Sequence, residues 1–526
     1  MPSLRVRQCY QRLLFYSLLL MLFIAVITWM ENEELMFRFK FDRSKTTIWT
    51  KLVTHSDLPR KLNTNEVMMQ SSFMTGEVTR KPNMTREITK MCLPKEDPSN
   101  ISTPFKIYIY ELPKKFNVDV KECMRGKEFS YCYDLDYCGM GSEIYRIDAP
   151  KNKSFEGLYD MSVRDSHMFA LEVLIHHKLQ HSPYITNDPR KADIFYIPAY
   201  IGLQCLCSQV STESVGKIVE DLFTFLKTQP YFLSGKPHFS TMSKIQREQS
   251  SGDCPYLQHS YTKNITFIGI EEEQNPNWAK YHKSQGGYMI VAPYPSYVHF
   301  IEKNFAEHNS AFMDNKRVQP DIYSSTIYLH TPTLENRKIF LFLAAGRRRS
   351  NSFRAKIMDQ FQNKTEFSYP AYIGKTNGRE YDHKMVMLYT DECKRNHRST
   401  TIEWMQHAIF CLQPPGDSPT RKSFYDAVLS GCIPVTFRSK LPLQYPFDRL
   451  LNYTKFMFTI PEESIEEGGN VLEILHSVAR DNIESMHLNL KQVAHWLQYS
   501  IPDGTITESN DALKLILLEL GKHYNL

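Results

Sequence analysis

The segment from Gln413 to Phe437 constrains the fold most strongly, because it predicts a loop, a short helix and a buried strand in direct succession. Gly416 frees the loop backbone, Ser418 is expected to cap the helix, and Pro419 suits the first helical position. Gly431 is typical of the left-handed position that follows a helix. We therefore predict an α/β unit whose helix begins near Pro419 and runs to Gly431.

The first turn of this helix carries two cations, Arg421 and Lys422. Free N–H groups at a helix N-terminus attract anions, and cations are unfavourable there unless a group such as a diphosphate accompanies them. An ordinary capped surface helix is the competing interpretation, because capped loop, helix and strand units are common in α/β folds. The physics of this segment alone leaves both interpretations open.

Four segments of the sequence resemble the motifs of one protein family. They cover residues 106–117 (KIYIYELPKKFN), 168–200, 337–357 and 410–437 (FCLQPPGDSPTRKSFYDAVLSGCIPVTF). Together they resemble exostosin-like glycosyltransferases, glycosyltransferase family 47, over nearly all of residues 104–460. The phrase PPGDSPTRKSFYDA is closest to the plant xyloglucan galactosyltransferase branch.

This resemblance implies both a fold class and a reaction. The fold is expected to be α/β of the GT-B type, in which two Rossmann-like domains face a cleft. Residues 104–330 would form the N-terminal, acceptor-side domain and residues 331–526 the C-terminal, nucleotide-sugar-binding domain. The implied reaction is metal-independent transfer of a sugar from a UDP-sugar to a polysaccharide or glycoconjugate, with inversion and without a cofactor. A catalytically silent subunit that binds glycans or supports an active partner is the alternative, because a fold does not imply activity.

Hydrophobic patterning agrees with two α/β halves. Apolar strand segments alternate with amphipathic helical segments between Phe105 and Val291, and a second set opens with a strand at Ile339–Ala344. Residues 293–333 are expected to link the halves. The amphipathic segment Asp511–Leu520 is expected to return to the first half.

An uncharged apolar segment at residues 13–30 is long enough to span a bilayer as a helix. Arginines precede it and glutamates follow it, so the positive-inside rule keeps residues 1–12 in the cytosol. Residues 31–103 are polar and are expected to form a luminal stem. We predict a single-pass type II protein of the Golgi membrane, whose thinner bilayer suits a short span. A cleaved signal peptide is the competing interpretation, although no small-residue cleavage pattern is present.

Sequons and cysteines fit a luminal body. Six sequons follow the apolar segment, and they begin at Asn83, Asn100, Asn152, Asn264, Asn363 and Asn452. Of the eleven cysteines, only Cys9 precedes that segment, and an oxidising lumen favours disulfides among the rest. We expect a bridge from Cys393 to Cys411 and a buried free thiol at Cys432, while the remaining connectivity stays open. A zinc site is disfavoured because no CxxC pair is present.

Alignment with the motifs of this family indicates which residues are expected to bind the nucleotide-sugar donor. The basic loop after the strand Ile339–Ala344 supplies Arg348 as the phosphate-binding arginine, because a guanidinium fork suits phosphate oxygens. Arg347 and Arg349 are expected to face solvent. The other expected nucleotide-sugar contacts are Gly416, Ser418, Thr420, Arg421 and Asp426, of which Asp426 would accept the ribose hydroxyls.

The sequence does not identify a general base or require a metal. Asp165, His167 and Glu172 lie near the start of a helix of the first half and are the candidate bases. Asp134 and Asp136 form a DxD pattern, which chelates a divalent metal in the other major glycosyltransferase fold, but they do not follow an apolar strand. Because the basic cluster can neutralise the leaving group, we expect no metal.

The net charge of the chain limits the classes of partner that it is expected to bind. The chain has 63 basic and 58 acidic residues and a net charge of +5, so it lacks the large basic field of nucleic-acid-binding proteins. The expected partners are the UDP-sugar, the acceptor glycan and, through one N-terminal helix, the membrane. An oligomer with itself or with other glycosyltransferases is compatible with these features.

Overall fold

The computed structural model describes residues that lie within one compact unit, Asn83–Leu526. These are residues 103–125, 134–150, 159–207, 214–272, 287–301, 329–345, 352–362, 371–376, 379–388, 395–438, 443–501 and 510–526. The predicted tail, anchor and nearly all of the stem lie outside the described residues. Six residues to which the sequence analysis assigns a role also lie outside the described residues: Arg348, Cys393, Asn83, Asn100, Asn152 and Asn363. Within the described ranges, no helix is both long and apolar enough to cross a membrane.

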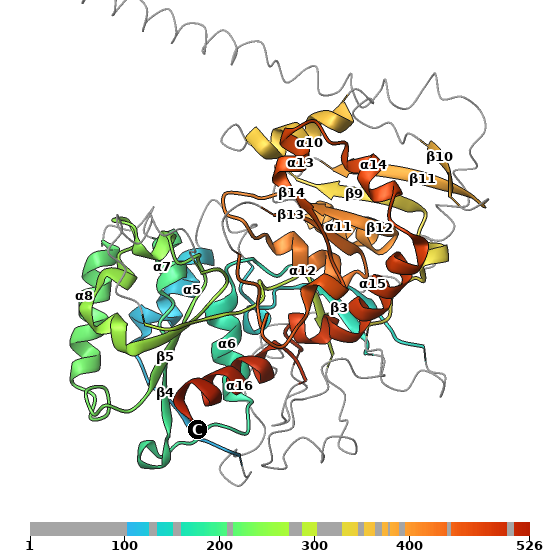
Figure 1. Ribbon diagram of the computed structural model, residues 1–526. Coiled ribbons are helices and arrows are strands. Elements are labelled where there is room, and N and C mark those ends of the chain that lie inside the picture. Colours follow the sequence, from blue (N-terminus) through green and yellow to red (C-terminus); the bar gives the residue numbers. More distant parts are fainter. Residues whose placement is uncertain are drawn as a thin grey trace, which may run out of the picture. The chain divides into compact units, whose positions relative to one another are not determined.

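Five parallel strands form the first sheet, in the order β1-β4-β5-β6-β7. Two of them, β4 and β5, are labelled in Figure 1. They are β1 (Ile107–Ile109), β4 (Ile194–Ile197), β5 (His238–Met242), β6 (Ile265–Gly269) and β7 (Met289–Val291). Along β4, Tyr196 packs in the hydrophobic cluster that includes α6 (Leu171–Gln180), whereas Phe195 packs in the one that includes α8 (Val215–Lys227). Helices therefore cover both faces of this sheet, which explains why β4 is apolar at every position.

The second sheet has six strands in the order β10-β11-β9-β12-β13-β14. They are β9 (Ile339–Ala344), β10 (Ala371–Thr376), β11 (Arg379–Leu388), β12 (Ala408–Gln413), β13 (Ile433–Arg438) and β14 (Phe458–Pro461). The pairings are parallel except for that between β10 and β11. This arrangement confirms the predicted mixed α/β fold with parallel sheets.

Helices also cover both faces of the second sheet. They are α10 (Ser352–Gln362), α11 (Arg395–Gln406), α12 (Lys422–Leu429), α13 (Glu462–Glu466), α14 (Val471–His476) and α15 (Arg480–Val493). Helices α10, α13 and α14 pack with Leu341 and Val435, whereas α11 and α12 pack with Phe342 and Cys411. Since α12 lies between β12 and β13 in the chain, the loop, helix and strand predicted for residues 413–437 are confirmed.

A third sheet is antiparallel and consists of β2 (Glu143–Ile147), β3 (Met161–Arg164) and β8 (Val298–Phe300). Strand β8 lies in residues 293–333, so this segment is more than the link that the sequence predicts. Phe300 N also donates to Gln498 Oε1 at 3.1 Å, and Ile501 N donates to Phe300 O at 2.8 Å. A strand of three residues carries too little periodicity to be recognised from sequence.

Helix α16 (Ala512–Tyr524) returns to the first sheet, as predicted for the segment Asp511–Leu520 (Figure 1). The Tyr524 hydroxyl lies 2.6 Å from Thr266 Oγ1 on β6 and donates to His238 O on β5 at 3.3 Å. The carboxylate of Asp511 caps the helix, because it accepts from Leu513 N. The C-terminal helix α16 therefore packs on the five-stranded half.

Three disulfides lie within the described residues. Cys123–Cys207 joins α5 (Val118–Arg125) to α7 (Ile201–Cys207), and Cys205–Cys254 joins α7 to the segment after β5. The third is Cys411–Cys432. The predicted bridge from Cys393 to Cys411 and the predicted free thiol at Cys432 are therefore wrong. Parallel pairing of β12 with β13 brings the two α-carbons to 5.8 Å, which periodicity within one strand cannot reveal.

Candidate functional site

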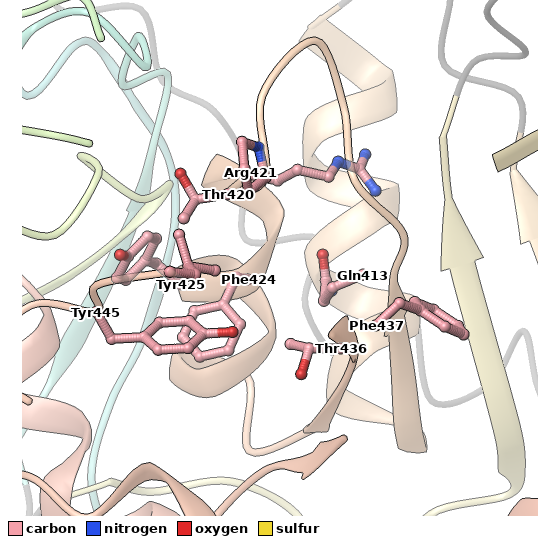
Figure 2. A pocket seen from close by; sticks show the side chains of 10 residues that line it. Gln413, Thr420, Arg421, Phe424, Tyr425, Thr436, Phe437 and Tyr445 are labelled. Carbon is pink, nitrogen blue, oxygen red and sulfur yellow. The ribbon is translucent and has the colours of Figure 1, made fainter. Parts of the chain in front are cut away.

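A pocket lies at the carboxyl ends of β12 and β13 and at the start of α12 (Figure 2). It encloses about 360 Å³ of empty space, part of which is open to solvent. Its walls combine aromatic and polar side chains: Gln413, Pro419, Thr420, Arg421, Phe424, Tyr425, Thr436, Phe437, Leu443 and Tyr445. Ligands of α/β proteins bind at this edge of a parallel sheet, so the pocket has the expected position for a substrate site.

The start of α12 differs from the prediction. The helix begins at Lys422 rather than near Pro419, its N-cap residue is Arg421, and no side chain caps it. Ser418 is not the cap, because its hydroxyl donates to Glu271 Oε2 at 3.0 Å. At the other end, the helix stops at Leu429 and Gly431 has φ +69°, which confirms the predicted left-handed position after the helix.

Two arginines hold the loop that precedes α12. Arg421 Nη2 donates to Ala344 O, at the end of β9, at 2.9 Å. Arg354 of α10 is buried, and its Nε donates to Pro415 O at 3.0 Å. A Cβ at Gly416 would lie 3.0 Å from Arg354 Nη2, so the predicted glycine permits this close approach. The loop therefore has a fixed backbone and two guanidinium groups beside it.

Aromatic rings form one wall of the pocket. Tyr445 and Phe424 lie side by side in Figure 2, with ring centroids 5.5 Å apart. Tyr445 also stacks on Tyr453, with ring centroids 4.5 Å apart. Tyr425 is 1% exposed, and its hydroxyl makes no hydrogen bond with the described residues. Burial raises the pKa of Tyr425, so this hydroxyl keeps its proton. A buried donor without a partner is unusual in a folded protein, but this hydroxyl has almost no accessible surface, so a ligand could reach it only if the pocket wall moves.

Asp426 does not line this pocket. Its carboxylate is 2% exposed and accepts hydrogen bonds from Ser296 Oγ at 2.7 Å, from Tyr297 N at 3.0 Å and from Lys422 Nζ at 2.9 Å. The Lys422 ammonium also lies over the Tyr297 ring. In this arrangement Asp426 connects α12 to the segment before β8, and its role toward a ribose remains a prediction.

The three candidate bases occupy different environments. Glu172 is fully buried, and its two oxygens accept from Gly202 N at 2.7 Å and from Leu203 N at 3.1 Å in the first turn of α7. Burial raises its pKa to about 7. His167 is partly exposed, and burial together with the Lys422 charge lowers its pKa to about 3. Asp165 is 8% exposed and follows β3. None of the three lines the pocket.

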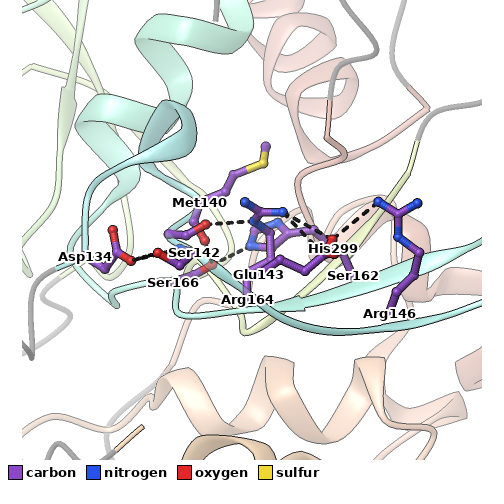
Figure 3. Close-up of polar contacts among 10 residues, drawn as sticks. Asp134, Met140, Ser142, Glu143, Arg146, Ser162, Arg164, Ser166 and His299 are labelled. Carbon is purple, nitrogen blue, oxygen red and sulfur yellow. Dashed lines mark hydrogen bonds and ion pairs between the residues drawn. The ribbon is translucent and has the colours of Figure 1, made fainter. Parts of the chain in front are cut away.

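Protein donors bind both DxD carboxylates, and Figure 3 shows the contact between Asp134 and Ser142. Asp134 Oδ2 accepts from Ser142 N at 2.8 Å and from Ser142 Oγ at 2.7 Å, whereas Asp136 Oδ1 pairs with Arg125. In the part of the chain that the structure describes, no group of three or more His, Cys, Asp or Glu side chains could hold a metal ion. These contacts give Asp134 and Asp136 a structural role in holding the turn before β2.

The sequons at Asn264 and Asn452 are the two within the described ranges, and both asparagines are exposed. Asn452 Oδ1 accepts from Thr454 N at 3.1 Å and from Thr454 Oγ1 at 2.6 Å. In the other sequon, Thr266 is buried against Tyr524. Modification of either asparagine remains a prediction.

Sequence reasoning missed most of the pocket wall. Phe424 fits the apolar face of a helix, so its periodicity indicates only core packing. Gln413 and Thr436 lie on strands, and Tyr445 follows a stretch without a regular pattern. The position of Gln413 at the end of a strand was the one signal that could have identified it.

Comparison with known proteins identifies the family. Residues 101–475 match the Exostosin GT47 domain. The chain belongs to the exostosin-like glycosyltransferases of family 47. This exostosin-like chain is 27% identical over 436 residues to the probable xyloglucan galactosyltransferase GT15 of Arabidopsis thaliana, covering 77% of this chain and 79% of the relative. It is 25% identical over 415 residues to the probable xyloglucan galactosyltransferase GT13 of the same plant, covering 75% and 78%.

Among solved structures, Anabaena Alr3699/HepE in complex with UDP is similar at 8% identity and a TM-score of 0.29. The match covers 64% of this exostosin-like chain and 79% of the Anabaena protein. A TM-score this low establishes neither a shared fold nor a shared ligand. The family assignment therefore depends on the sequence match alone.

Proposed function

We propose that this exostosin-like protein is an inverting glycosyltransferase that moves a sugar from a UDP-sugar to a polysaccharide or glycoconjugate acceptor. The observation that carries the proposal is the pocket at the ends of β12 and β13, because the segment that carries the family resemblance forms most of it. The five-stranded and six-stranded sheets would be the acceptor and donor halves of a GT-B enzyme. The names of the Arabidopsis relatives support a polysaccharide acceptor.

The pocket has groups suited to each part of a nucleotide sugar. The rings of Phe424 and Tyr445 offer apolar surface for a uracil. Arg421 lies at the start of α12, where the helix dipole and N–H groups favour a diphosphate, whereas both donors of Thr420 bind Glu271. Arg348, in the loop after β9, is proposed to join Arg421, since Arg421 already reaches the last residue of that strand.

These cations would stabilise the departing UDP. As the bond from the sugar to the diphosphate breaks, negative charge grows on the leaving oxygen, and fixed guanidinium groups lower the energy of that transition state. A single displacement by the acceptor hydroxyl needs a base but no enzyme nucleophile, which is the basis for proposing inversion. The same cations are the basis for proposing that a divalent metal is dispensable.

The proposed location is the Golgi membrane, with the catalytic body in the lumen and residues 13–30 as the anchor. Buried disulfides in both halves support an oxidising compartment. Protease protection of a C-terminal tag on intact microsomes tests this location. Digestion of the tag without detergent would contradict it.

UDP binding by the luminal body tests the function itself. Ligand at 100 times its Kd should stabilise the fold by about 2.7 kcal/mol, measured as a rise in melting temperature. Arg421→Ala should weaken UDP affinity by about 10- to 150-fold, because one charge-assisted phosphate contact contributes about 1.5 to 3 kcal/mol. Arg190→Ala is the matched control, since Arg190 is an exposed arginine paired with Asp188.

Turnover then separates the enzyme from the silent subunit. UDP-galactose with xyloglucan oligosaccharides is the first pair to assay, followed by other UDP-sugars. Activity that survives excess EDTA, with an inverted anomeric product by NMR, would support the full proposal. UDP binding without turnover on any acceptor would favour the silent subunit, and absence of UDP binding would contradict the donor site.

A further inference from the structure

Glu271 connects the two halves at the proposed donor loop. It follows β6 of the five-stranded sheet by two residues and is 4% exposed. Ser418 Oγ donates to its Oε2 at 3.0 Å, Thr420 N donates to the same oxygen at 3.0 Å, and Thr420 Oγ1 donates there as well. A carboxylate from one half therefore lies against the loop that precedes α12 in the other.

The two oxygens of this carboxylate have different surroundings. Three donors converge on Oε2, whereas no donor from the described residues reaches Oε1. A carboxylate that is fixed through one oxygen and open at the other has the arrangement that a positioned proton acceptor requires. A purely structural carboxylate such as that of Glu172 has both oxygens bound by backbone N–H groups.

We propose that Glu271 is the general base of the transfer reaction, an inference that rests on the proposed function. The acceptor hydroxyl gives its proton to Oε1 while its oxygen forms a bond to the anomeric carbon of the donor sugar. The bond between that carbon and the diphosphate oxygen breaks, and UDP leaves with the electron pair. Glu271 is then neutral and returns its proton to solvent after the products leave.

The position of Glu271 relative to the pocket favours this role. Thr420 lines the pocket and donates to Glu271 from its side chain, so one residue separates the carboxylate from the proposed donor. The pocket belongs to the six-stranded half and Glu271 to the five-stranded half. An acceptor bound by the five-stranded half would therefore meet the base and the donor sugar together.

The charged and titratable groups around Glu271 also fit a base. Burial raises its pKa above the usual range of a glutamate, and the nearby Arg247 guanidinium opposes this shift. Tyr294 lies on another side and is neutral, because burial raises its own pKa. The carboxylate is therefore a stronger proton acceptor than an exposed glutamate. His167, with a pKa of about 3, is a much weaker one.

Glu271→Gln tests the proposal, because a glutamine oxygen can accept from Ser418 and Thr420 while the base is lost. In the full luminal body we expect turnover to fall by about 100-fold or more and UDP affinity to change less than about threefold. The acidic limb of the pH profile should disappear in Glu271→Gln. Glu271→Asp keeps a carboxylate and should recover part of the turnover and the limb. Glu248→Gln is the matched control and should retain activity, because Glu248 is a nearby, partly exposed acid paired with Lys244.

Two results would overturn the inference. If Glu271→Gln keeps turnover within about threefold of the unmodified protein, Glu271 is not the base. If turnover and UDP affinity fall together while the acidic limb persists, Glu271 only positions the loop. Failure of the proposed function is distinct, because the unmodified protein would then show no transfer with any donor. That result would remove the general-base role as well.

Discussion

The five-stranded and six-stranded halves differ in how their polar side chains are used. In the five-stranded half, Glu172 is bound at both oxygens by α7, and the Asp134 carboxylate holds the turn before β2. In the six-stranded half, the polar side chains of Gln413, Thr420 and Arg421 line a pocket. These carboxylates of the first half thus serve its fold, whereas the second half places polar side chains around a space that a ligand can occupy.

This difference indicates how the site is divided. One continuous stretch, residues 413–445, forms most of the pocket in the six-stranded half. The five-stranded half approaches it through Glu271, which meets Ser418 and Thr420. Donor binding is thus expected to depend on local structure in one half, and catalysis on the contact between both halves.

Removal of a disulfide in each half gives the largest expected effect on stability. Replacing Cys411 and Cys432 by Ala should cost about 3 kcal/mol, and replacing Cys205 and Cys254 about 4 kcal/mol, because the second pair closes a longer loop. Thermal melting measures both losses. Only the first replacement should also weaken UDP binding, measured by calorimetry well below the melting temperature. Equal weakening of UDP binding by both replacements would contradict the assignment of donor binding to the six-stranded half.

Gly431→Ala tests whether the end of α12 is as tightly fixed as the pocket requires. At Gly431 φ is +69°, and an added Cβ would overlap Arg337 Nη2 and Thr331 Oγ1. We expect a loss of about 2 to 4 kcal/mol from backbone strain and overlap together. Gly468→Ala is the control, since Gly468 has φ +98° but nothing within 4 Å of a Cβ, and should lose about 1 kcal/mol. Chemical denaturation measures both, and equal losses would show that the site can relax.

Tyr425→Phe has the smallest expected effect and tests whether a ligand reaches this buried hydroxyl. Because the hydroxyl has no partner among the described residues, its removal should leave the stability of the free protein unchanged or slightly raised. If it donates to UDP, affinity should fall by about fivefold, which corresponds to about 1 kcal/mol. Calorimetric titration measures this change. Lower stability together with unchanged affinity would show that the hydroxyl serves the fold.

Much of the fold could be predicted because its strands are continuous apolar runs between turn residues. The strand Ile339–Ala344 has the predicted bounds. The small antiparallel sheet could not be predicted, because β8 pairs with β3 across more than 130 residues and carries no pattern of its own. Disulfide pairing failed for the same reason, since it depends on which strands are neighbours.

The candidate site could be predicted only where it is local. The sequence locates the loop and helix of residues 413–437, together with Gly416 and Gly431. It places the helix start wrongly because the hydroxyl of Ser418 is engaged by Glu271, 147 residues earlier in the chain. Contacts of this length are invisible to periodicity, so both Glu271 and the partners of Asp426 required the structure.

The central claim is that the nucleotide binds in the pocket of the six-stranded half. A crystal structure of the luminal body with UDP tests it most directly. We expect the uracil beside Phe424 and Tyr445 and the diphosphate within hydrogen-bonding distance of Arg421. UDP bound at the strand ends of the five-stranded sheet, with the pocket at the carboxyl ends of β12 and β13 empty, would contradict the account.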